Sequence, residues 1–430
     1  MTLVILGETL SYLRINGIWP KSGHELNPGK WFYIKFILLL TSQSVILIGS
    51  SAHLVVSVQN DSSNIFLDLV ILIGEVGVFY FNATYVRYEE PIAKIFTHLS
   101  NFNKFGKPPN FAQRNKKLMF WSRLYKTYID AALVSIYLEP FIKLKSCERE
   151  NLKRKFKEIC GLVVATWAPF DISVFPFKQI LYVWQVYTLM FTLKGAALIS
   201  FSIMESMEHL VVRIQHLKTM LLETVETEDA KLRVERLLKC VEYHNDIFGV
   251  GQEMDKNFAN CLFLHVLFSG ALFGCIGYIV METFSLLSYS LFLGWVLSLI
   301  IVSVSGQHVM DEGLSVGDTA YNSKWYDRNA SFQRNIVLII IRSQRPILIH
   351  AGPFSYLSHV IVLTISKSVE YYYNIYKFCE KADISTNLKE LKVGKLLSRE
   401  RFMSGLIKLR NIFQLFANLT APERLTLVDV

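Results

Sequence analysis

The sequence WFYIKFILLLTSQSVILIGSSAHLVV occupies residues 31–56, and Lys35 is its only charged side chain. A helix needs about 20 mostly apolar residues to cross the hydrocarbon core of a bilayer. This stretch therefore predicts a membrane-spanning helix. Further segments that meet or approach this length lie at residues 65–86, 177–205, 257–280, 284–305 and 347–376.

The composition favours a membrane protein. Of the 430 residues, 52% are hydrophobic and 19% are charged, and the mean hydropathy is +0.31. A soluble protein carries about 25% charged residues, so this chain is too apolar to cover a soluble surface. The net charge of +9 fits loops beside anionic lipid better than a nucleic-acid partner.

A seventh span is expected at residues 124–143, although this segment contains Lys126, Asp130, Glu139 and Pro140. It is the one apolar region between residues 90 and 176. Between the fourth and fifth spans, residues 206–256 carry apolar side chains at helical spacing among charges, which predicts membrane helices that continue into water. The expected fold is all-α, with seven transmembrane helices.

The orientation follows from the positive charges of the loops, because Lys and Arg gather on the cytoplasmic side. With the N-terminus inside, the inner segments hold 23 Lys and Arg, against 18 outside when the segment after residue 376 is included. We therefore expect an inverted topology, with the N-terminus inside and the C-terminus outside. A G-protein-coupled receptor has the opposite arrangement.

Three polar residues of the second span, Asp68, Glu75 and Asn82, are spaced by seven and so share one helix face. They either line a path for a ligand or an ion, or they are structural. In the structural interpretation, which we favour, Glu75 pairs with Lys126 or Lys194. Lys194 itself is interpreted as a paired structural cation.

Five short motifs follow one another over about 50 residues. They are Gly306-Gln307, Ala320-Tyr321, Lys324-Trp325-Tyr326, the run from Ile341 to Pro346, and Ala351-Gly352. Together they resemble the C-terminal signature of insect odorant receptors. Earlier pieces of the chain agree, namely Gly17 to Pro20, Trp167 to Asp171, Cys240, and His244 to Ile247.

The resemblance implies a tetrameric, non-selective cation channel gated by volatile ligands, in the plasma membrane of olfactory neuron dendrites. One odorant-tuned subunit type, as this chain is expected to be, assembles with a shared odorant receptor co-receptor. Residues 1–376 would form the seven-helix subunit. Residues 377–430 are a basic amphipathic tail that is atypical of the family.

In this family the last helix is split into a cytoplasmic part and a pore-lining part. The chain supports such a split, because Arg342 and Arg345 cannot face lipid and Pro346 removes a helix donor. Residues 324–345 are expected in water and 354–376 in the membrane. The resemblance implies assembly roles for Trp325, Tyr326, Arg342 and Arg345, and a pore lining of Glu370, Tyr373 and Asn374.

The ligand site is expected to be an apolar cavity with few polar groups, and the resemblance places it in the outer half of the bundle. A depth of about 10 Å corresponds to seven helical residues. The residues selected by this depth are Leu72, Gly74, Val78, Val134, Tyr137, Trp184, Tyr187, Phe191, Tyr289 and Phe292. His265 is not included, because it is interpreted as a hydrogen-bond donor between helices.

Cys147 and Cys160 share the expected outer loop, where they form either a disulfide or two free thiols. No metal or other cofactor is expected, because the sequence contains neither H-E-x-x-H nor G-K-[ST]. The G-x-S-x-G pattern at residues 313–317 lies in the polar stretch after the sixth span, so a hydrolase is not expected.

The sequence fits other functions less well. A G-protein-coupled receptor would need an acidic-Arg-Tyr run and Asn-Pro-x-x-Tyr, and neither is present. A transporter or membrane enzyme would need paired broken helices in both halves of the chain, and only the last expected span is broken. A gustatory receptor of the same superfamily is the closest alternative, and the Trp-Tyr and Arg-Ser-Gln-Arg-Pro pieces favour the odorant branch.

Overall fold

The computed structural model describes residues 3–60, 65–152, 157–282, 286–352 and 355–363. Within these ranges the chain forms helices and no β-strand, which confirms the all-α prediction; a single isolated bridge joins His350 and Tyr356. The elements are α1 (Gly7–Ile15), α2 (Lys30–Gln59), α3 (Ile65–Arg87), α4 (Glu89–Ser100), α5 (Phe111–Ile142), α6 (Leu144–Asn151), α7 (Phe177–Glu226), α8 (Ala230–Glu282), α9 (Leu286–Asn322), the 3-10 turn η1 (Trp325–Asp327) and α10 (Ala330–Ser343).

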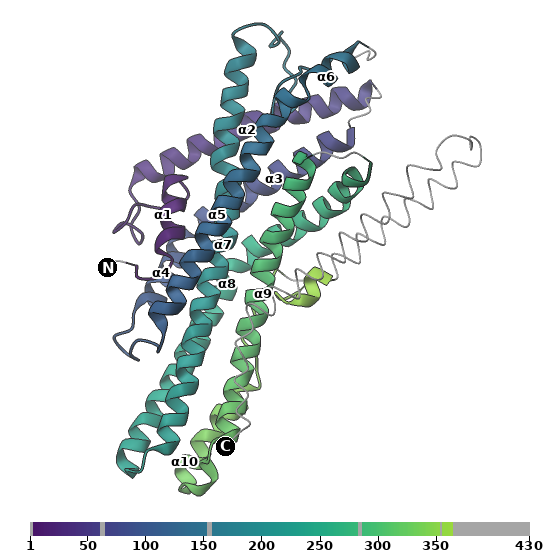
Figure 1. The fold of residues 1–430 in the computed structure, drawn as a ribbon. Coiled ribbons are helices and arrows are strands. Elements are labelled where there is room, and N and C mark those ends of the chain that lie inside the picture. The colour runs from purple at the N-terminus through teal and green to yellow at the C-terminus, as the bar shows by residue number, and fades with distance from the viewer. Residues whose placement is uncertain (1–2, 61–64, 153–156, 283–285, 353–354, 364–430) are drawn as a thin grey trace, which may run out of the picture.

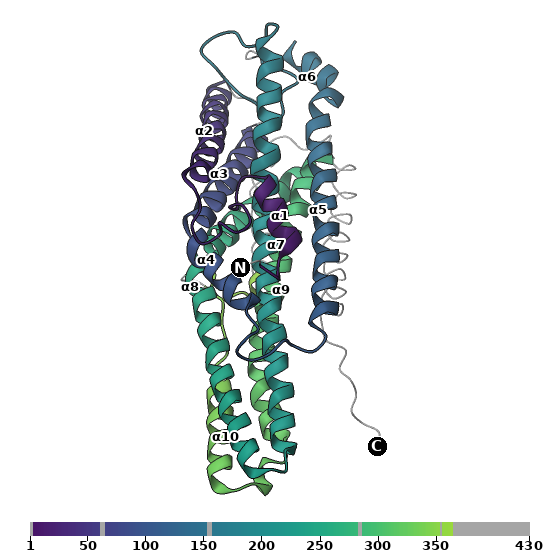
Figure 2. The ribbon, with the colours of Figure 1, turned by 90° about the vertical axis from the view of Figure 1, so that its left-hand side faces the viewer.

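Helix α7 is the central element of the bundle. It has 50 residues, which at 1.5 Å per residue gives about 75 Å, more than twice the hydrocarbon thickness. It packs against α1, α2, α3, α5, α8 and α9. Figures 1 and 2 show it running from the end where α6 lies to the end where α10 lies. The 53-residue α8 is similarly long, so the amphipathic segments continue the membrane helices as the sequence predicted.

Among the described residues, four helices are long and apolar enough to cross a membrane, namely Lys30–Gln59, Leu67–Arg87, Phe177–Glu226 and Phe292–Asn322. The third expected span lies in α5, which begins at Phe111, before the expected start at residue 124. The additional turns carry charged residues and extend the helix beyond its apolar part. Half of the last expected span, residues 347–376, falls outside the described residues.

The segment around the start of the last expected span, residues 347–376, contains two breaks. Helix α10 ends at Ser343, directly before the Gln344-Arg345-Pro346 run. Gly352 then adopts a positive φ of 69°, a conformation that glycine permits. Residues 324–345, expected as one aqueous helix, form η1 and α10 joined by a short extended link.

The N-terminal segment is buried inside the bundle, which the sequence did not predict. Leu6, Leu10 and Leu13 are fully buried, and Trp19 packs against Phe96 with a ring-centroid distance of 5.4 Å. The hydroxyl of Thr9 donates to Glu205 of α7 over 2.6 Å. The amphipathic segment α1 is therefore part of the packed core rather than a surface arm.

The polar residues on one face of α3 make structural contacts with neighbouring helices. Nδ1 of His53 lies 3.1 Å from Asp68, and the amide of Asn82 donates to the Thr192 carbonyl over 3.0 Å. Glu75 accepts a 3.4 Å hydrogen bond from Ser50. The expected pairing of Glu75 with Lys126 or Lys194 is wrong, because both lysines contact a different carboxylate.

That carboxylate is Asp130 of α5. Its two oxygens lie 2.5 Å from Nζ of Lys194 on α7 and 2.6 Å from Nζ of Lys126. Lys194 is buried within the bundle, so its charge has little contact with solvent. The interpretation of Lys194 as a paired structural cation is confirmed.

Asp130→Asn should destabilise the protein, because it leaves the buried charge of Lys194 without a carboxylate. We expect a loss of about 1–2 kcal/mol, at the lower end of the range for charged hydrogen bonds because Asp130 is partly exposed. The loss would appear as a lower Tm of the purified protein in detergent.

The exposed pair Glu90–Lys94 provides the control, and Glu90→Gln should cost less than about 0.5 kcal/mol. The double variant Asp130→Leu/Lys194→Met should recover most of the lost stability, because no buried charge remains. Equal Tm values for Asp130→Asn and Glu90→Gln would contradict a stabilising role for this ion pair.

Candidate functional site

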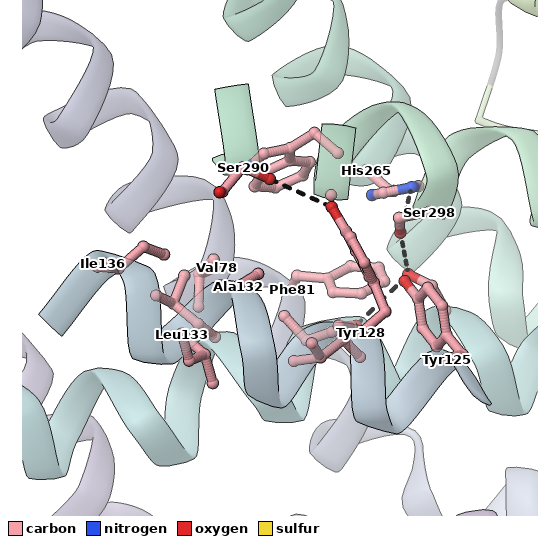
Figure 3. A pocket seen from close by; sticks show the side chains of 17 residues that line it. Val78, Phe81, Tyr125, Tyr128, Ala132, Leu133, Ile136, His265, Ser290 and Ser298 are labelled. Carbon is pink, nitrogen blue, oxygen red and sulfur yellow. Dashed lines mark hydrogen bonds between the residues drawn. The ribbon is translucent and has the colours of Figure 1, made fainter. Parts of the chain in front are cut away.

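A cavity of about 90 Å³ lies between α3, α5, α7, α8 and α9 (Figure 3). This volume accommodates roughly six to nine water-sized molecules, and so a small organic molecule. The lining is mostly apolar, with a few hydroxyl groups and one imidazole. The lining residues are Val78, Phe81, Tyr125, Tyr128, Ile129, Ala132, Leu133, Ile136, Leu193, Ala196, Ala197, Ser200, His265, Ser290, Gly294, Trp295 and Ser298.

The cavity exists because small residues on three helices face one another. Ala132 on α5, Ala196 and Ala197 on α7, and Gly294 on α9 all line it. The α5 lining positions run from Tyr125 to residue 136 at alternating intervals of three and one, which is one face of an α-helix. Larger side chains at the alanine and glycine positions would fill the space.

Three rings are stacked along one wall of the cavity. The ring centroids of Phe81 and His265 are 5.2 Å apart, and those of His265 and Trp295 are 5.7 Å apart. The interplanar angles are 29° and 23°. His265 is thus held between two aromatic planes, and its ring orientation is defined by packing.

A chain of hydrogen bonds leads away from this wall (Figure 3). Nε2 of His265 lies 3.2 Å from Oγ of Ser298, which donates over 2.8 Å to Oγ of Ser200. Ser200 donates in turn to the Ala196 carbonyl over 3.4 Å. The contact between His265 and Ser298 joins α8 to α9, as expected for a histidine that bonds between helices.

The ten residues selected by depth are distributed differently from the expectation. Of the nine whose side chains the structure describes, Val78 alone lines the cavity. Val134, Trp184 and Tyr187 are exposed on the bundle surface, and the side chain of Tyr289 lies outside the described part. The remaining five, which do not line the cavity, are Leu72, Gly74, Tyr137, Phe191 and Phe292.

The difference has two physical causes. The cavity lies deeper, since Val78 is thirteen residues from the start of α3, about 20 Å along the axis. The rotation of each helix also matters, because Val134 is two residues from Ala132 and so points to another side of α5. The α5 lining residues could have been found from their helical spacing, but the sequence did not indicate which face of α5 is internal.

The loop after α6 folds back onto the bundle. A disulfide joins Cys147 to Cys160, with the two Cα atoms 5.8 Å apart. The side-chain carbonyl of Gln185 accepts from the backbone N–H groups of Val163 and Val164, and its amide donates to the Val164 carbonyl over 2.9 Å. Helix α7 therefore holds the loop over the end of the bundle where α6 lies.

A family model described as 7tm Odorant receptor matches residues 79–368, well over half of the chain. The chain belongs to the 7tm odorant receptor family. This confirms the resemblance that the C-terminal motifs indicated.

Curated relatives match shorter parts of this odorant receptor. Odorant receptor 67c of Drosophila melanogaster is 26% identical over 150 residues, 34% of this chain and 37% of the relative. Odorant receptor 22c of the same species is 32% identical over 127 residues, 28% of this chain and 31% of the relative. Odorant receptor Or2 of Anopheles gambiae is 24% identical over 121 residues, 27% and 32% of the two chains. The matches thus span about a third of each relative.

Solved structures show the same fold. The olfactory receptor OR5 from Machilis hrabei in complex with eugenol superposes with a TM-score of 0.71 at 14% identity, over 86% of this chain and 96% of that chain. A second structure of the same receptor gives a TM-score of 0.72 at 15% identity, over 86% of this chain and 97% of that chain. The odorant receptor is therefore a multi-pass membrane protein with the fold of an insect olfactory receptor.

The residues expected to act in assembly lie at the end of the receptor where α10 is found. Trp325 packs partly buried against the core, and its indole N–H donates to the Tyr321 carbonyl over 3.1 Å. Tyr326 and Arg345 are exposed, and the guanidinium of Arg342 lies 3.4 Å from the ring centroid of Phe248. The expected pore residues Glu370, Tyr373 and Asn374 lie outside the described residues.

A polar cluster joins α7 to α9 beyond the apolar part of the bundle. His308 lies 3.1 Å from Glu208 and 3.9 Å from Glu312, and Lys218 contacts Glu312 over 2.9 Å. Burial alone would lower the pKa of His308, but the two carboxylates outweigh it and raise the pKa above 6.5. Burial would raise the pKa of Glu208, but His308 lowers it below 4.5.

Within the described residues, no group of His, Cys, Asp and Glu could hold a metal ion. The cluster around His308 is therefore an ion-pair network between two helices. Its charges compensate one another, which is the condition for burial of several ionised groups.

The receptor's stability should depend on pH through this cluster. The raised pKa of His308 contributes stability that is complete below pH 6.5 and is lost as the pH rises through the folded value. The lowered pKa of Glu208 contributes stability that is complete above pH 4.5 and is lost as the pH falls through its folded value. The two contributions are complete together between these limits.

Thermal unfolding in detergent from pH 5 to 9 measures this dependence. His308→Gln should flatten the alkaline fall in Tm, whereas His24→Gln, at an exposed position in the link between α1 and α2, should retain the wild-type curve. An unchanged alkaline limb in His308→Gln would assign the fall to other groups.

Proposed function

We propose that this protein is an olfactory receptor, the odorant-binding subunit of a heteromeric, ligand-gated, non-selective cation channel. Its partner would be the odorant receptor co-receptor, and its site the plasma membrane of olfactory neuron dendrites. The observation that carries the proposal is the apolar cavity between α3, α5, α7, α8 and α9 in a chain of this family. A gustatory receptor of the same superfamily is the alternative.

The cavity suits a small volatile ligand. Its wall offers stacked rings and aliphatic side chains, which gain from burying apolar surface. Few polar groups face it, so a strongly hydrated ligand would lose more hydrogen bonds to water than it gained. These properties favour small, hydrophobic molecules that carry at most one or two polar atoms.

The exposed surface near η1 and α10 supports assembly with a partner. Leu338 and Ile341 of α10 are more than half exposed, as is Tyr326 of η1. Exposed apolar and aromatic side chains on one short helix are typical of an interface. In this proposal Trp325 holds the interface residues in place by packing against the hydrophobic core. It does not line the cavity.

The orientation and the pore complete the proposal. The Lys and Arg count favours an orientation with the N-terminus inside. Glu370 would lie toward the outer end of the pore, where four copies would repel one another at roughly 4 kcal/mol per pair at 4 Å, less in a water-filled pore. A co-receptor would reduce the number of copies, and the remaining carboxylates would favour cations.

Co-expression with the co-receptor should produce odour-evoked cation current, whereas this chain alone should produce none. Whole-cell recording with an odour panel measures both.

Trp325→Ala should reduce co-purification of the co-receptor and current for every odour alike, because it acts on assembly. Glu370→Gln in the mixed channel should lower the preference for cations over anions.

Robust current from this chain alone would overturn the heteromer proposal. A Trp325→Ala variant with normal assembly and an altered odour ranking would instead assign that residue to ligand selection. An epitope tag at residue 1 that stains unpermeabilised cells would overturn the orientation.

Filling the cavity should abolish odour responses without unfolding the protein. Ala132→Leu adds three carbon atoms that point into the cavity, so the volume left for a ligand shrinks. We expect odour-evoked current to fall by at least tenfold while the amount of receptor at the cell surface is preserved, measured by surface labelling and recording in the same cells.

Ala131→Leu is the matched control, because the neighbouring residue on α5 is exposed and does not line the cavity. It should respond as the wild type does. Wild-type responses from a well-expressed Ala132→Leu receptor would place the odorant elsewhere.

A further inference from the structure

His265 carries a buried polar atom that no described residue satisfies. The side chain is 3% exposed and lines the cavity. Its Nε2 contacts Ser298, but Nδ1 has no hydrogen-bond partner among the described residues. Buried polar atoms without a partner are rare in folded proteins. One on a side chain that lines a cavity is available to a polar group bound there.

The hydrogen-bond chain behind His265 determines which ring nitrogen carries the proton. Ser298 uses its single hydroxyl proton to donate to Ser200, and Ser200 uses its own to donate to the Ala196 carbonyl. Oγ of Ser298 can therefore only accept from His265. The proton lies on Nε2, and Nδ1 presents a lone pair.

The imidazole is neutral in this setting. Among the described residues, no carboxylate lines the cavity. A buried imidazolium would therefore lose its hydration without a counter-charge to compensate for the loss. A neutral imidazole with its proton on Nε2 has one remaining function at Nδ1, which is to accept a hydrogen bond.

The hydroxyl groups around the cavity are already engaged with protein acceptors. The hydroxyl of Tyr128 donates to the Ser290 carbonyl over 3.4 Å, and that of Ser290 lies 3.2 Å from the hydroxyl of Ser135. Tyr125 hydrogen-bonds to Ser298. A ligand carbonyl or ether would find these donors occupied, whereas a ligand hydroxyl would find the free acceptor of His265.

We propose that the cavity selects odorants that carry a hydroxyl group, alcohols or phenols, whose O–H donates to Nδ1 of His265. The proposal rests on the proposed function, since it assigns a ligand class to the same cavity. The apolar remainder of the odorant would pack against the stacked rings of Phe81 and Trp295. Aldehydes, esters and ethers of the same shape lack the donor and would leave Nδ1 unpaired.

Matched probes test this in wild-type receptor co-expressed with the co-receptor. The probes are benzyl alcohol, benzaldehyde and benzyl methyl ether, with 1-hexanol and hexanal as an aliphatic pair. At least one alcohol should have an EC50 about tenfold below that of its matched carbonyl or ether, the ratio expected for one buried hydrogen bond made or lost.

Two substitutions separate the acceptor from the ring. His265→Phe keeps a planar ring and removes the acceptor, so the alcohol EC50 should rise about tenfold while those of the aldehyde and ether change less than threefold. His265→Asn offers a side-chain oxygen and should retain part of the alcohol preference. His216→Phe, a histidine remote from the cavity, should keep the wild-type ratio.

Ligand-induced thermal stabilisation of the purified receptor gives a second measurement that does not require gating. Alcohols should raise the Tm of the wild type more than their ethers do, and His265→Phe should remove that difference. Stabilisation without current would reject the channel proposal and retain the hydroxyl preference. The preference would be overturned by a wild type that favours aldehydes or ethers, or by an alcohol preference that survives in His265→Phe.

Discussion

The hydrocarbon core of a bilayer offers no hydrogen-bonding partner, and the rest of this structure depends on that constraint. Backbone groups must be satisfied within each segment, which leaves helices as the available element for this chain. Polar side chains inside the bundle must find one another, and they do so between helices. Asp130 joins α5 to α7 through Lys194, and Asp68 joins α3 to α2 through His53.

These inter-helix contacts also explain what the sequence could and could not predict. The long apolar runs predicted α2, α3, α7 and α9 because a membrane span has a length and composition of its own. The burial of α1 was not predictable in this way. Its apolar residues are few, and they are buried because Thr9 and Trp19 meet side chains more than 70 residues away in the sequence.

The cavity shows the same limit at the level of single residues. Its position depends on the rotation of five helices, and small residues such as Ala132 and Gly294 come together from distant parts of the chain. A depth measured along one helix selected Val78, which lines the cavity, but placed Trp184 and Tyr187 inward, although both face outward. Composition identifies the membrane spans, whereas the face of each span that points inward depends on how the neighbouring helices pack.

The length of α7 gives the molecule a mechanical property. Ser200 borders the cavity, and the helix continues without a proline to Glu226, about 40 Å further along its axis. A rigid rod of that length acts as a lever, and a tilt of about 3° at the cavity displaces its far tip by roughly 2 Å. That tip is coupled to the next element, because Arg328 donates to the Val225 carbonyl over 2.7 Å. A shift of less than 1 Å in α7 around a ligand would thus become a larger displacement at the start of α10. This transmission requires no bend in α7.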